Sequence, residues 1–194
     1  MVATGNPGKL TEFRRLLARY PWDVLSLDDA GYGHDLQELG TTYDENALGK
    51  ASMVASATGL VTLADDSGIE VEALRGWPGP ESARWMGDGA SGPQLLQGLI
   101  EAVGRRSPDD RRVRYVCVVA LCRPSADPVV ARGETEGTLV QPRGENGFGY
   151  DPGFLSGDLG MTFGEASDAE KDRVSHRGRA VARLAQSGVL DSAW

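Results

Sequence analysis

The chain has 194 residues, of which 40% are hydrophobic and 25% are charged, a composition typical of a folded globular domain with a sizeable core. The formal net charge of −8 argues against a general nucleic-acid binder, which would carry a basic face. A small anionic substrate is compatible with this charge, because a local cationic pocket can lie on an acidic surface.

Two further features bear on the cellular location. No apolar stretch approaches the roughly 18 residues of a membrane span, and no signal peptide precedes Thr4. Cys117 and Cys122 lie in one apolar run, which is typical of small core residues rather than of a disulfide or a metal site. We therefore expect a cytoplasmic enzyme or binding domain.

The first residues predict a strand, a turn and a helix. Residues 1–3 are typical of a short strand, Asn6 is a good helix N-cap and Pro7 suits the first helical position. Apolar residues then repeat at helical spacing from Leu10 to Leu17. Backbone N–H groups between Thr4 and Lys9 would point at any bound anion.

A second helix and an interrupted strand follow. Thr42 to Glu45 form a capping box, and the helix that begins there should end near Gly59. Gly49 inside this helix should cost about 1 kcal/mol relative to alanine. The apolar residues 60–64 predict a strand that runs into Asp65-Asp66-Ser67-Gly68 and resumes at residues 69–74.

The remaining elements mix helices and strands without strict alternation. In chain order, we expect a Gly- and Pro-rich loop at 75–92, a helix from Pro93 through Val103, strands at 113–121, 129–132 and 137–140, a glycine-rich loop at 144–152, a capping box at 167–170 and a last helix at about 179–186. The strand at 113–121 is apolar on both faces in its second half and should be central. The pattern favours an α/β fold with a mixed sheet, built as a single domain over residues 1–194.

Lysine is rare in this chain and stands in three polar, turn-rich neighbourhoods. Of 20 basic residues, 17 are arginine and three are Lys9, Lys50 and Lys171. A lysine ammonium is suited to holding a phosphate oxygen as a point charge, so three of them together would bind a polyphosphate. The alternative is that three positions fall near these motifs by chance.

Asp65 and Asp66 are the leading catalytic candidates. Two carboxylates after a buried strand can hold Mg²⁺ or take a proton from water. Adjacent strand residues face opposite ways, so we expect one of the pair to face the site directly. The alternative is an ordinary turn containing Asp and Gly. Glu38 is by composition one of 28 acidic residues, with a solvated surface role as the default.

Two later segments also carry candidate groups. In Gly147-Phe148-Gly149-Tyr150-Asp151-Pro152, glycines flank an aromatic residue that could stack on a nucleobase, or that could pack on the core in a tight turn. Ser175-His176-Arg177-Gly178 gathers hydrogen-bond donors at a predicted helix start, or simply caps that helix. His34 lies in a polar loop without an assigned role. The chain has no Walker A pattern, zinc-ligand spacing or nucleophilic serine elbow.

The motifs together resemble the inosine triphosphate pyrophosphatase family. In order along the chain they are Thr-Gly-Asn-x-Gly-Lys at 4–9, Glu-Asn-Ala-x-x-Lys-Ala at 45–51, Ala-Asp-Asp-Ser-Gly-x-x-Val at 64–71, Ser-Ala-Arg at 82–84, Gly-Phe-Gly-Tyr-Asp-Pro at 147–152 and Ser-His-Arg-Gly at 175–178. The resemblance implies an elongated α/β fold of two lobes around a long mixed sheet, with the active site in the cleft between them. It also implies a homodimer that uses Mg²⁺ to hydrolyse dITP, ITP and XTP to the monophosphate and pyrophosphate, and so removes deaminated purines from the nucleotide pool.

The resemblance assigns roles residue by residue. Glu38 and Asp66 would hold the metal, and Asp66 would be the proton acceptor. The residues expected to contact the phosphates are Thr4, Gly5, Asn6, Pro7, Gly8, Lys9 and Lys50. Ser67 would contact the substrate, and the nucleoside side would be formed by Phe148, Gly149, Tyr150, Asp151, Lys171, His176 and Arg177. The resemblance therefore assigns Lys171 to the nucleoside, and not to the triphosphate that Lys9 and Lys50 would contact.

Three positions depart from the pattern of the family. Gly49 and Gly153 stand where apolar residues are usual, and Trp85 replaces a tyrosine. These departures affect local stability more than activity, because none is a charged position of the motifs. Two other functions remain open from the residues: a pyrophosphatase for another modified nucleotide, and a nucleotide-binding sensor without activity.

Overall fold

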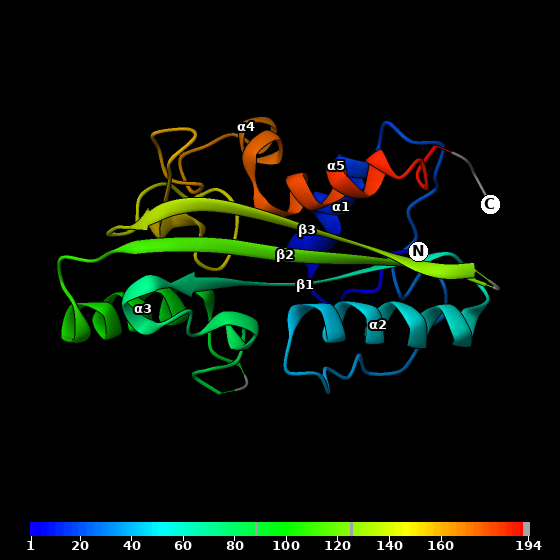
Figure 1. The fold of residues 1–194 in the computed structure, drawn as a ribbon, viewed down its shortest axis with the longest axis horizontal. Coiled ribbons are helices and arrows are strands. Elements are labelled where there is room, and N and C mark those ends of the chain that lie inside the picture. The colour runs from blue at the N-terminus through cyan, green and yellow to red at the C-terminus, as the bar shows by residue number, and fades with distance from the viewer. Residues whose placement is uncertain (88, 125, 192–194) are drawn as a thin grey trace. The chain divides into compact units, whose positions relative to one another are not determined.

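The structure, a computed structural model, describes residues 1–87, 89–124 and 126–191 (Figure 1). Its helices are α1 (Pro7–Leu17), α2 (Tyr43–Thr58), α3 (Gly92–Arg106), α4 (Asp168–Val174) and α5 (His176–Gln186). Its strands are β1 (Thr62–Val71), β2 (Arg112–Arg123), β3 (Ala126–Leu139) and β4 (Phe154–Ser156). Short 3₁₀ turns lie at η1 (Glu72–Leu74), η2 (Gly79–Glu81) and η3 (Asp151–Gly153). Among the described helices, none is long and apolar enough to cross a membrane.

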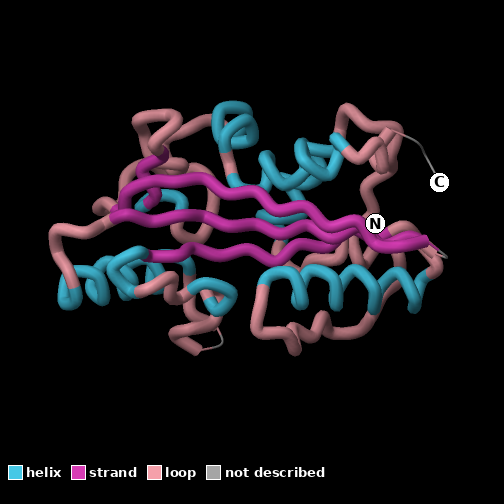
Figure 2. Tube along the Cα trace, viewed as in Figure 1, coloured by secondary structure: helices cyan, strands magenta, loops and turns pink. Residues whose placement is uncertain are grey.

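The strands form one sheet in the order β1-β2-β3-β4. Strand β4 pairs antiparallel with the end of β3, with Gly137 opposite Ser156 and Leu139 opposite Phe154. Val2, by contrast, forms a parallel bridge to Leu63 of β1, so both strand directions occur. Figure 2 shows the helices and strands of this mixed α/β fold. The predicted fold class and the central position of β2 are confirmed.

The chain divides into two compact units. Unit 1 contains Met1–Asp66, Cys117–Gly133 and Arg177–Trp194, and unit 2 contains Ser67–Val116 and Glu134–His176. The unit boundaries fall inside β1, β2 and β3 and at the first residue of α5. Each of these strands therefore contributes residues to both units.

The core of unit 1 lies between strands and two helices. Phe13 and Leu17 of α1 and Leu184 of α5 pack with Leu63 of β1 and Val119 of β2, and all five are almost completely buried. Figure 1 shows α5 above these strands and α2 below them, with α1 crossing behind the strands in this view. Helix α2 presents small residues to the strands, including Ala47 and Ala51, which have no exposed surface.

The core of unit 2 is rich in aromatic rings. Tyr115 of β2 packs against Phe154 of β4 and against Phe163, with ring centroids 4.5 and 6.1 Å away. Apolar residues of α3, among them Leu96 and Leu99, belong to the same cluster. This cluster supports the loop that contains residues 147–152.

The local helix signals in the sequence are confirmed. The Asn6 side chain caps α1 with Pro7 in the first turn, and capping boxes begin α2 at Thr42 and α4 at Ser167. Helix α2 ends at Gly59, whose φ of 70° is left-handed and therefore favours glycine.

Three expected boundaries were wrong. Strand β1 continues through the expected interruption at residues 65–68, because both aspartates have buried polar partners and need not turn toward water. The two strands expected at 129–132 and 137–140 are one strand, β3. Within it, Glu134 pairs with Arg114 and Thr135 donates to Asp158, so polar residues are accommodated without a break. Helix α5 begins three residues earlier than expected, at His176.

Trp85 stabilises the loop in which it replaces tyrosine. Its indole Nε1 donates to the Tyr150 hydroxyl over 2.7 Å, and its ring makes an edge contact with Trp77. In the same loop, Ser82 Oγ accepts from the Ile69 amide at 2.9 Å and donates to the Gly79 carbonyl. The Ser-Ala-Arg motif thus ties the loop to β1.

The two unusual glycines should respond in opposite ways to alanine. A Cβ on Gly49 meets no atom within 4 Å, so Gly49→Ala should stabilise the protein by about 1 kcal/mol through helix propensity. A Cβ on Gly153 would lie 2.3 Å from Leu96 Cδ1, so Gly153→Ala should destabilise it by about 1–3 kcal/mol. Urea unfolding of both variants measures the difference, and equal changes of the same sign would contradict it.

Candidate functional site

The loop before α1 is organised by its own side chains. Asn6 Oδ1 accepts from the amides of Gly8 and Lys9 at 2.9 and 3.2 Å, and Thr4 Oγ1 accepts from the Asn6 amide at 3.2 Å. These bonds fix the start of α1 and aim the Lys9 side chain. A phosphate at the first helical amides would have to replace the Asn6 oxygen, because that oxygen already accepts from two of them.

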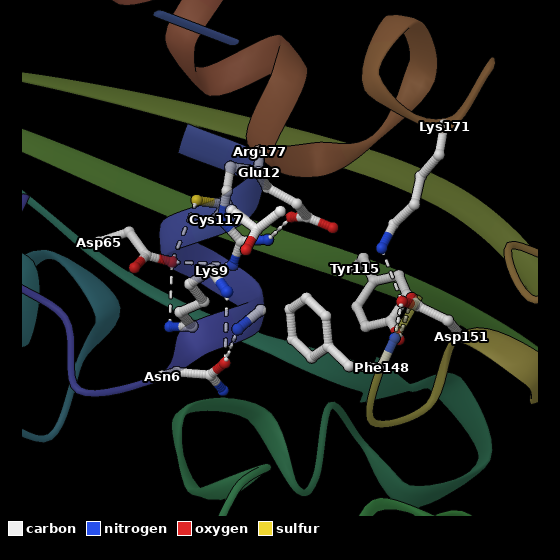
Figure 3. A network of polar contacts seen from close by, with 12 residues as sticks. Asn6, Lys9, Glu12, Asp65, Tyr115, Cys117, Phe148, Asp151, Lys171 and Arg177 are labelled. Carbon is white, nitrogen blue, oxygen red and sulfur yellow. Dashed lines mark hydrogen bonds and ion pairs between the residues drawn. The ribbon is translucent and has the colours of Figure 1, made fainter. Parts of the chain in front are cut away.

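A buried network of four charges lies at the centre of unit 1. Asp65 Oδ2 accepts from Lys9 Nζ at 3.0 Å and from the Arg177 guanidinium at 2.9 Å (Figure 3). The other terminal nitrogen of Arg177 pairs with Glu12, which comes from α1. Asp65 and Arg177 are each 1% exposed. The network therefore joins α1, β1 and α5 by two positive and two negative groups.

The network sets the protonation of its members. Burial by itself would raise the pKa of Asp65, but the charges of Lys9 and Arg177 outweigh it and hold this pKa well below the usual range. Burial raises the pKa of the neighbouring Cys117 thiol, whose sulfur lies 3.8 Å from Asp65 Oδ2, and the Asp65 charge raises it further. Asp65 is therefore ionised and Cys117 is protonated at neutral pH.

Asp66 occupies a different environment from its neighbour. Its Oδ2 accepts from Asn46 Nδ2 at 3.0 Å, and Asn46 Oδ1 in turn accepts from the Gly40 amide at 2.9 Å. Burial raises the pKa of Asp66, and the charge of Glu38 adds to this, while Lys50 and the Asn46 bond oppose it. Asp66 is thus a stronger base than an ordinary aspartate, held in place by one amide.

Glu38 and Lys50 form a close pair in the same region of unit 1. Lys50 Nζ lies 2.5 Å from Glu38 Oε1, and the Lys50 side chain is only 6% exposed. The charges of both residues act on the pKa of Asp66, so the three groups form one electrostatic set. Lys50 and Asn46 stand one turn apart on α2, which explains why both reach this place.

The donor set fits magnesium bound together with a nucleotide. Within the described residues, no group of three His, Cys, Asp or Glu side chains gathers as in an all-protein metal site. Mg²⁺ usually binds through one or two carboxylates and completes its shell with water and substrate phosphates. Glu38 and Asp66 supply two carboxylates, and a bound cation would offset both the burial and the Glu38 charge, which raise the pKa of Asp66.

Two of the residues predicted for the nucleoside, Phe148 and Lys171, contact Asp151 in unit 2. Asp151 Oδ2 accepts from Lys171 Nζ at 2.6 Å and from the Phe148 amide at 2.7 Å (Figure 3). The Lys171 ammonium also lies 5.0 Å from the centre of the Phe148 ring. The Tyr150 hydroxyl, by contrast, donates to the Ser82 carbonyl and accepts from Trp85, so this group is used inside the protein.

The predicted site residues therefore form two groups. Unit 1 holds residues 4–9, Glu38, Lys50, Asp66 and Arg177, and unit 2 holds Ser67, residues 148–151, Lys171 and His176. The groups adjoin in the chain at Asp66–Ser67 and at His176–Arg177. Arg177, predicted for the nucleoside side, has its guanidinium in the carboxylate network of unit 1. Its contact with a nucleoside stays a prediction.

Three residues with evident roles were assigned none by the sequence analysis, although Asn46 lies in the motif at 45–51. Glu12 holds Arg177, Asn46 holds Asp66 and Tyr115 donates to Asp151 over 3.2 Å. Helical spacing carried a signal for two of them, because Glu12 stands one turn after Lys9 and Asn46 one turn before Lys50. Tyr115 lies in an apolar strand, where nothing distinguishes it from a core residue.

Comparisons with known proteins agree with the motifs. Residues 1–187 match the Ham1 family. This chain belongs to that family. It is 40% identical over 194 residues to a dITP/XTP pyrophosphatase of Bacillus licheniformis, covering 100% of this chain and 98% of the relative. It is 44% identical over 188 residues to a dITP/XTP pyrophosphatase of Thermus thermophilus, covering 96% and 90%.

A solved structure of another member has the same fold. The Ham1 protein of Coxiella burnetii superposes with a TM-score of 0.86 at 36% identity, over 96% of this chain and 95% of that one. The predicted family resemblance is thereby confirmed across the whole length of the chain.

The buried network gives a test of its own. Glu12→Gln removes one of the two carboxylates that neutralise the Arg177 guanidinium, and loss of a partner from a buried ion pair should destabilise the protein by about 3 kcal/mol. Glu101→Gln on α3 makes the same substitution in an exposed pair with Arg105 and should change stability by less than about 0.5 kcal/mol. Urea unfolding compares them, and similar midpoints would show that the buried pair contributes nothing.

Proposed function

We propose that this Ham1-family chain hydrolyses deaminated purine nucleoside triphosphates, namely dITP, ITP and XTP, to the nucleoside monophosphate and pyrophosphate. The observation that carries the proposal is the pair of adjacent buried aspartates with opposite pKa shifts. Asp65 is held ionised by Lys9 and Arg177, whereas Asp66 has a raised pKa and one orienting amide. When neighbouring carboxyl groups have environments that shift their pKa values in opposite directions, one typically stays ionised and the other serves in proton transfer. The dITP/XTP pyrophosphatase relatives support the choice of substrate.

The reaction is the attack of water on the α-phosphorus. Asp66 accepts the proton of the water while a new P–O bond forms and the bond from the α-phosphorus to the bridging oxygen breaks, releasing pyrophosphate. The amide of Asn46 keeps the receiving carboxylate oriented. Mg²⁺, held by Glu38 and Asp66, would supply charge neutralisation for the triphosphate. Lys9 and Lys50 add two positive charges in the same unit.

Recognition of the base rests on the residues of unit 2. Hypoxanthine and xanthine carry a carbonyl at position six, whereas adenine carries an amino donor there. His176 and the Lys171 ammonium are buried groups that can donate to a carbonyl at position six, whereas an adenine amino group offers them no acceptor there. The Phe148 ring, which already holds the Lys171 cation near its face, offers a surface for stacking.

The assembly and the location are proposed on the resemblance of the motifs to the family. We propose a homodimer in the cytoplasm, where a nucleotide pool is available to the enzyme. Light scattering coupled to gel filtration tests the first part, with twice the mass of the chain as the expected result. Elution at the mass of one chain across a range of concentrations would contradict it.

Asp66→Asn should reduce turnover by about 100-fold or more, because the amide can neither accept the proton nor contribute a charge to metal binding. Pyrophosphate release from dITP at saturating Mg²⁺ is the measurement. Asp109→Asn, in an exposed turn, is the matched control and should retain full activity. A near-normal rate in the Asp66 variant would remove this residue from the mechanism.

The substrate is tested with a panel of nucleoside triphosphates, with and without Mg²⁺, scored for pyrophosphate and for orthophosphate separately. Pyrophosphate from dITP, ITP and XTP in the presence of Mg²⁺ is expected, with little from dATP. Product from a modified pyrimidine alone would identify a different nucleotide pyrophosphatase. Binding of dITP without product would identify a nucleotide sensor.

A further inference from the structure

Tyr115 touches two predicted nucleoside-side residues from one position in β2. Its hydroxyl donates to Asp151 Oδ1 over 3.2 Å, and its ring stacks on the His176 ring with centroids 4.5 Å apart and planes 13° apart. Asp151 lies in the glycine-rich loop and His176 begins α5, so the two contacts join segments that are distant in the sequence. All three residues belong to unit 2.

The contact with Asp151 controls how this carboxylate is turned. Its other oxygen, Oδ2, already accepts from Lys171 and from the Phe148 amide. The Tyr115 hydroxyl therefore holds the second oxygen, Oδ1, and restricts the rotation of the carboxylate about its Cβ–Cγ bond together with the two donors on Oδ2. A rotated carboxylate would carry the Lys171 ammonium with it, because the two are joined at 2.6 Å and are both buried.

The contact with His176 controls the plane of the imidazole. The two rings are nearly parallel, so the Tyr115 ring sets the plane in which both ring nitrogens of His176 lie. The hydrogen-bond donors of a histidine lie in its ring plane, and the direction in which they point is what a base can recognise.

Tyr115 is itself held rigidly. Its side chain is 6% exposed, and the Phe154 and Phe163 rings pack against it with centroids 4.5 and 6.1 Å away. A site is selective only when its contacting groups are fixed by well-packed neighbours. Tyr115 is such a well-packed neighbour for both Asp151 and His176.

We propose that Tyr115 is a positioning residue for base selection, which orients Lys171 through Asp151 and orients His176 through ring stacking. This rests on the proposed hydrolysis of dITP and related triphosphates. Tyr115 makes no contact with the substrate in this role. Its effect falls on the choice between a six-carbonyl and a six-amino purine, and the residues around Asp66 are unaffected.

Tyr115→Phe removes the hydroxyl and keeps the ring, so the fold and the stacking on His176 are retained. The ratio of kcat/KM for dITP to that for dATP should fall about fivefold to tenfold, mainly through a higher KM for dITP. Tyr32→Phe, which removes the hydroxyl of a buried tyrosine in unit 1, should leave the ratio unchanged. A ratio equal to that of the parent protein in the Tyr115 variant, or an equal loss of kcat on both substrates, would overturn the proposal.

A double-mutant cycle tests whether the effect passes through Asp151. In the Asp151→Asn background, Tyr115→Phe should no longer change the dITP to dATP ratio, because the two residues act as one unit. If the two substitutions instead change the dITP to dATP ratio independently, so that their effects multiply, Tyr115 does not act through Asp151. If the parent protein itself fails to release pyrophosphate from dITP, the proposed function fails, and that outcome is separate from any effect of Tyr115.

The stacking on His176 has a readout that needs no activity. The chain contains two histidines, so a proton–carbon spectrum of the aromatic region shows two sets of imidazole signals. Tyr115→Leu should move only the His176 set downfield, because the shielding by the stacked ring is lost. Tyr32→Leu should move only the set of His34, which contacts Tyr32 edge-on. Unmoved His176 signals in the Tyr115 variant would show that the ring does not orient this histidine.

Discussion

The ionised carboxylate of Asp65 is the group on which the arrangement of unit 1 depends. It lies inside the protein with 1% of its surface exposed, and an isolated charge there would be unfavourable by several kcal/mol. Lys9 and Arg177 compensate it, and Glu12 balances the second cation. Because these partners come from α1 and α5, satisfying one carboxylate brings both helices onto the strands in a fixed register. The apolar contacts of Phe13 and Leu184 then add stability to an arrangement that the charges have specified.

The alternation of side chains along β1 gives two adjacent aspartates different chemistry. Asp65 points to the side of Lys9 and Arg177, and Asp66 has Asn46 of α2 as its partner. Figure 1 shows α2 and α5 on opposite sides of the strands in that view. One carboxylate is consequently surrounded by cations and stays ionised. Burial raises the pKa of the other carboxylate, and the nearby charge of Glu38 adds to this against the opposing effects of Lys50 and the Asn46 amide, which makes it the stronger base of the two.

Local features of the sequence predicted local features of the fold. The caps of α1, α2 and α4 were visible because a cap and the amide that it binds lie within three residues of each other. The motifs likewise predicted the family. The partners of the charged groups were not visible, since Lys9 and Asp65 are 56 positions apart and Glu12 and Arg177 are 165 apart. The same reason explains the wrong boundaries of β1, where an Asp-Asp-Ser-Gly run reads as a turn until its buried partners are known.

The three lysines differ physically from the arginines of the chain. Each of them pairs with one carboxylate at 3.0 Å or less: Lys9 with Asp65, Lys50 with Glu38 and Lys171 with Asp151. Arg112, at the surface, instead donates to the Asp110 carboxylate with two nitrogens. A planar guanidinium bound in this way uses two of its donors on a single carboxylate. A lysine ammonium, by contrast, has three N–H donors that point in three directions. A lysine held by a carboxylate therefore keeps two further donors, and this property suits the phosphate and base contacts that we propose for these three positions.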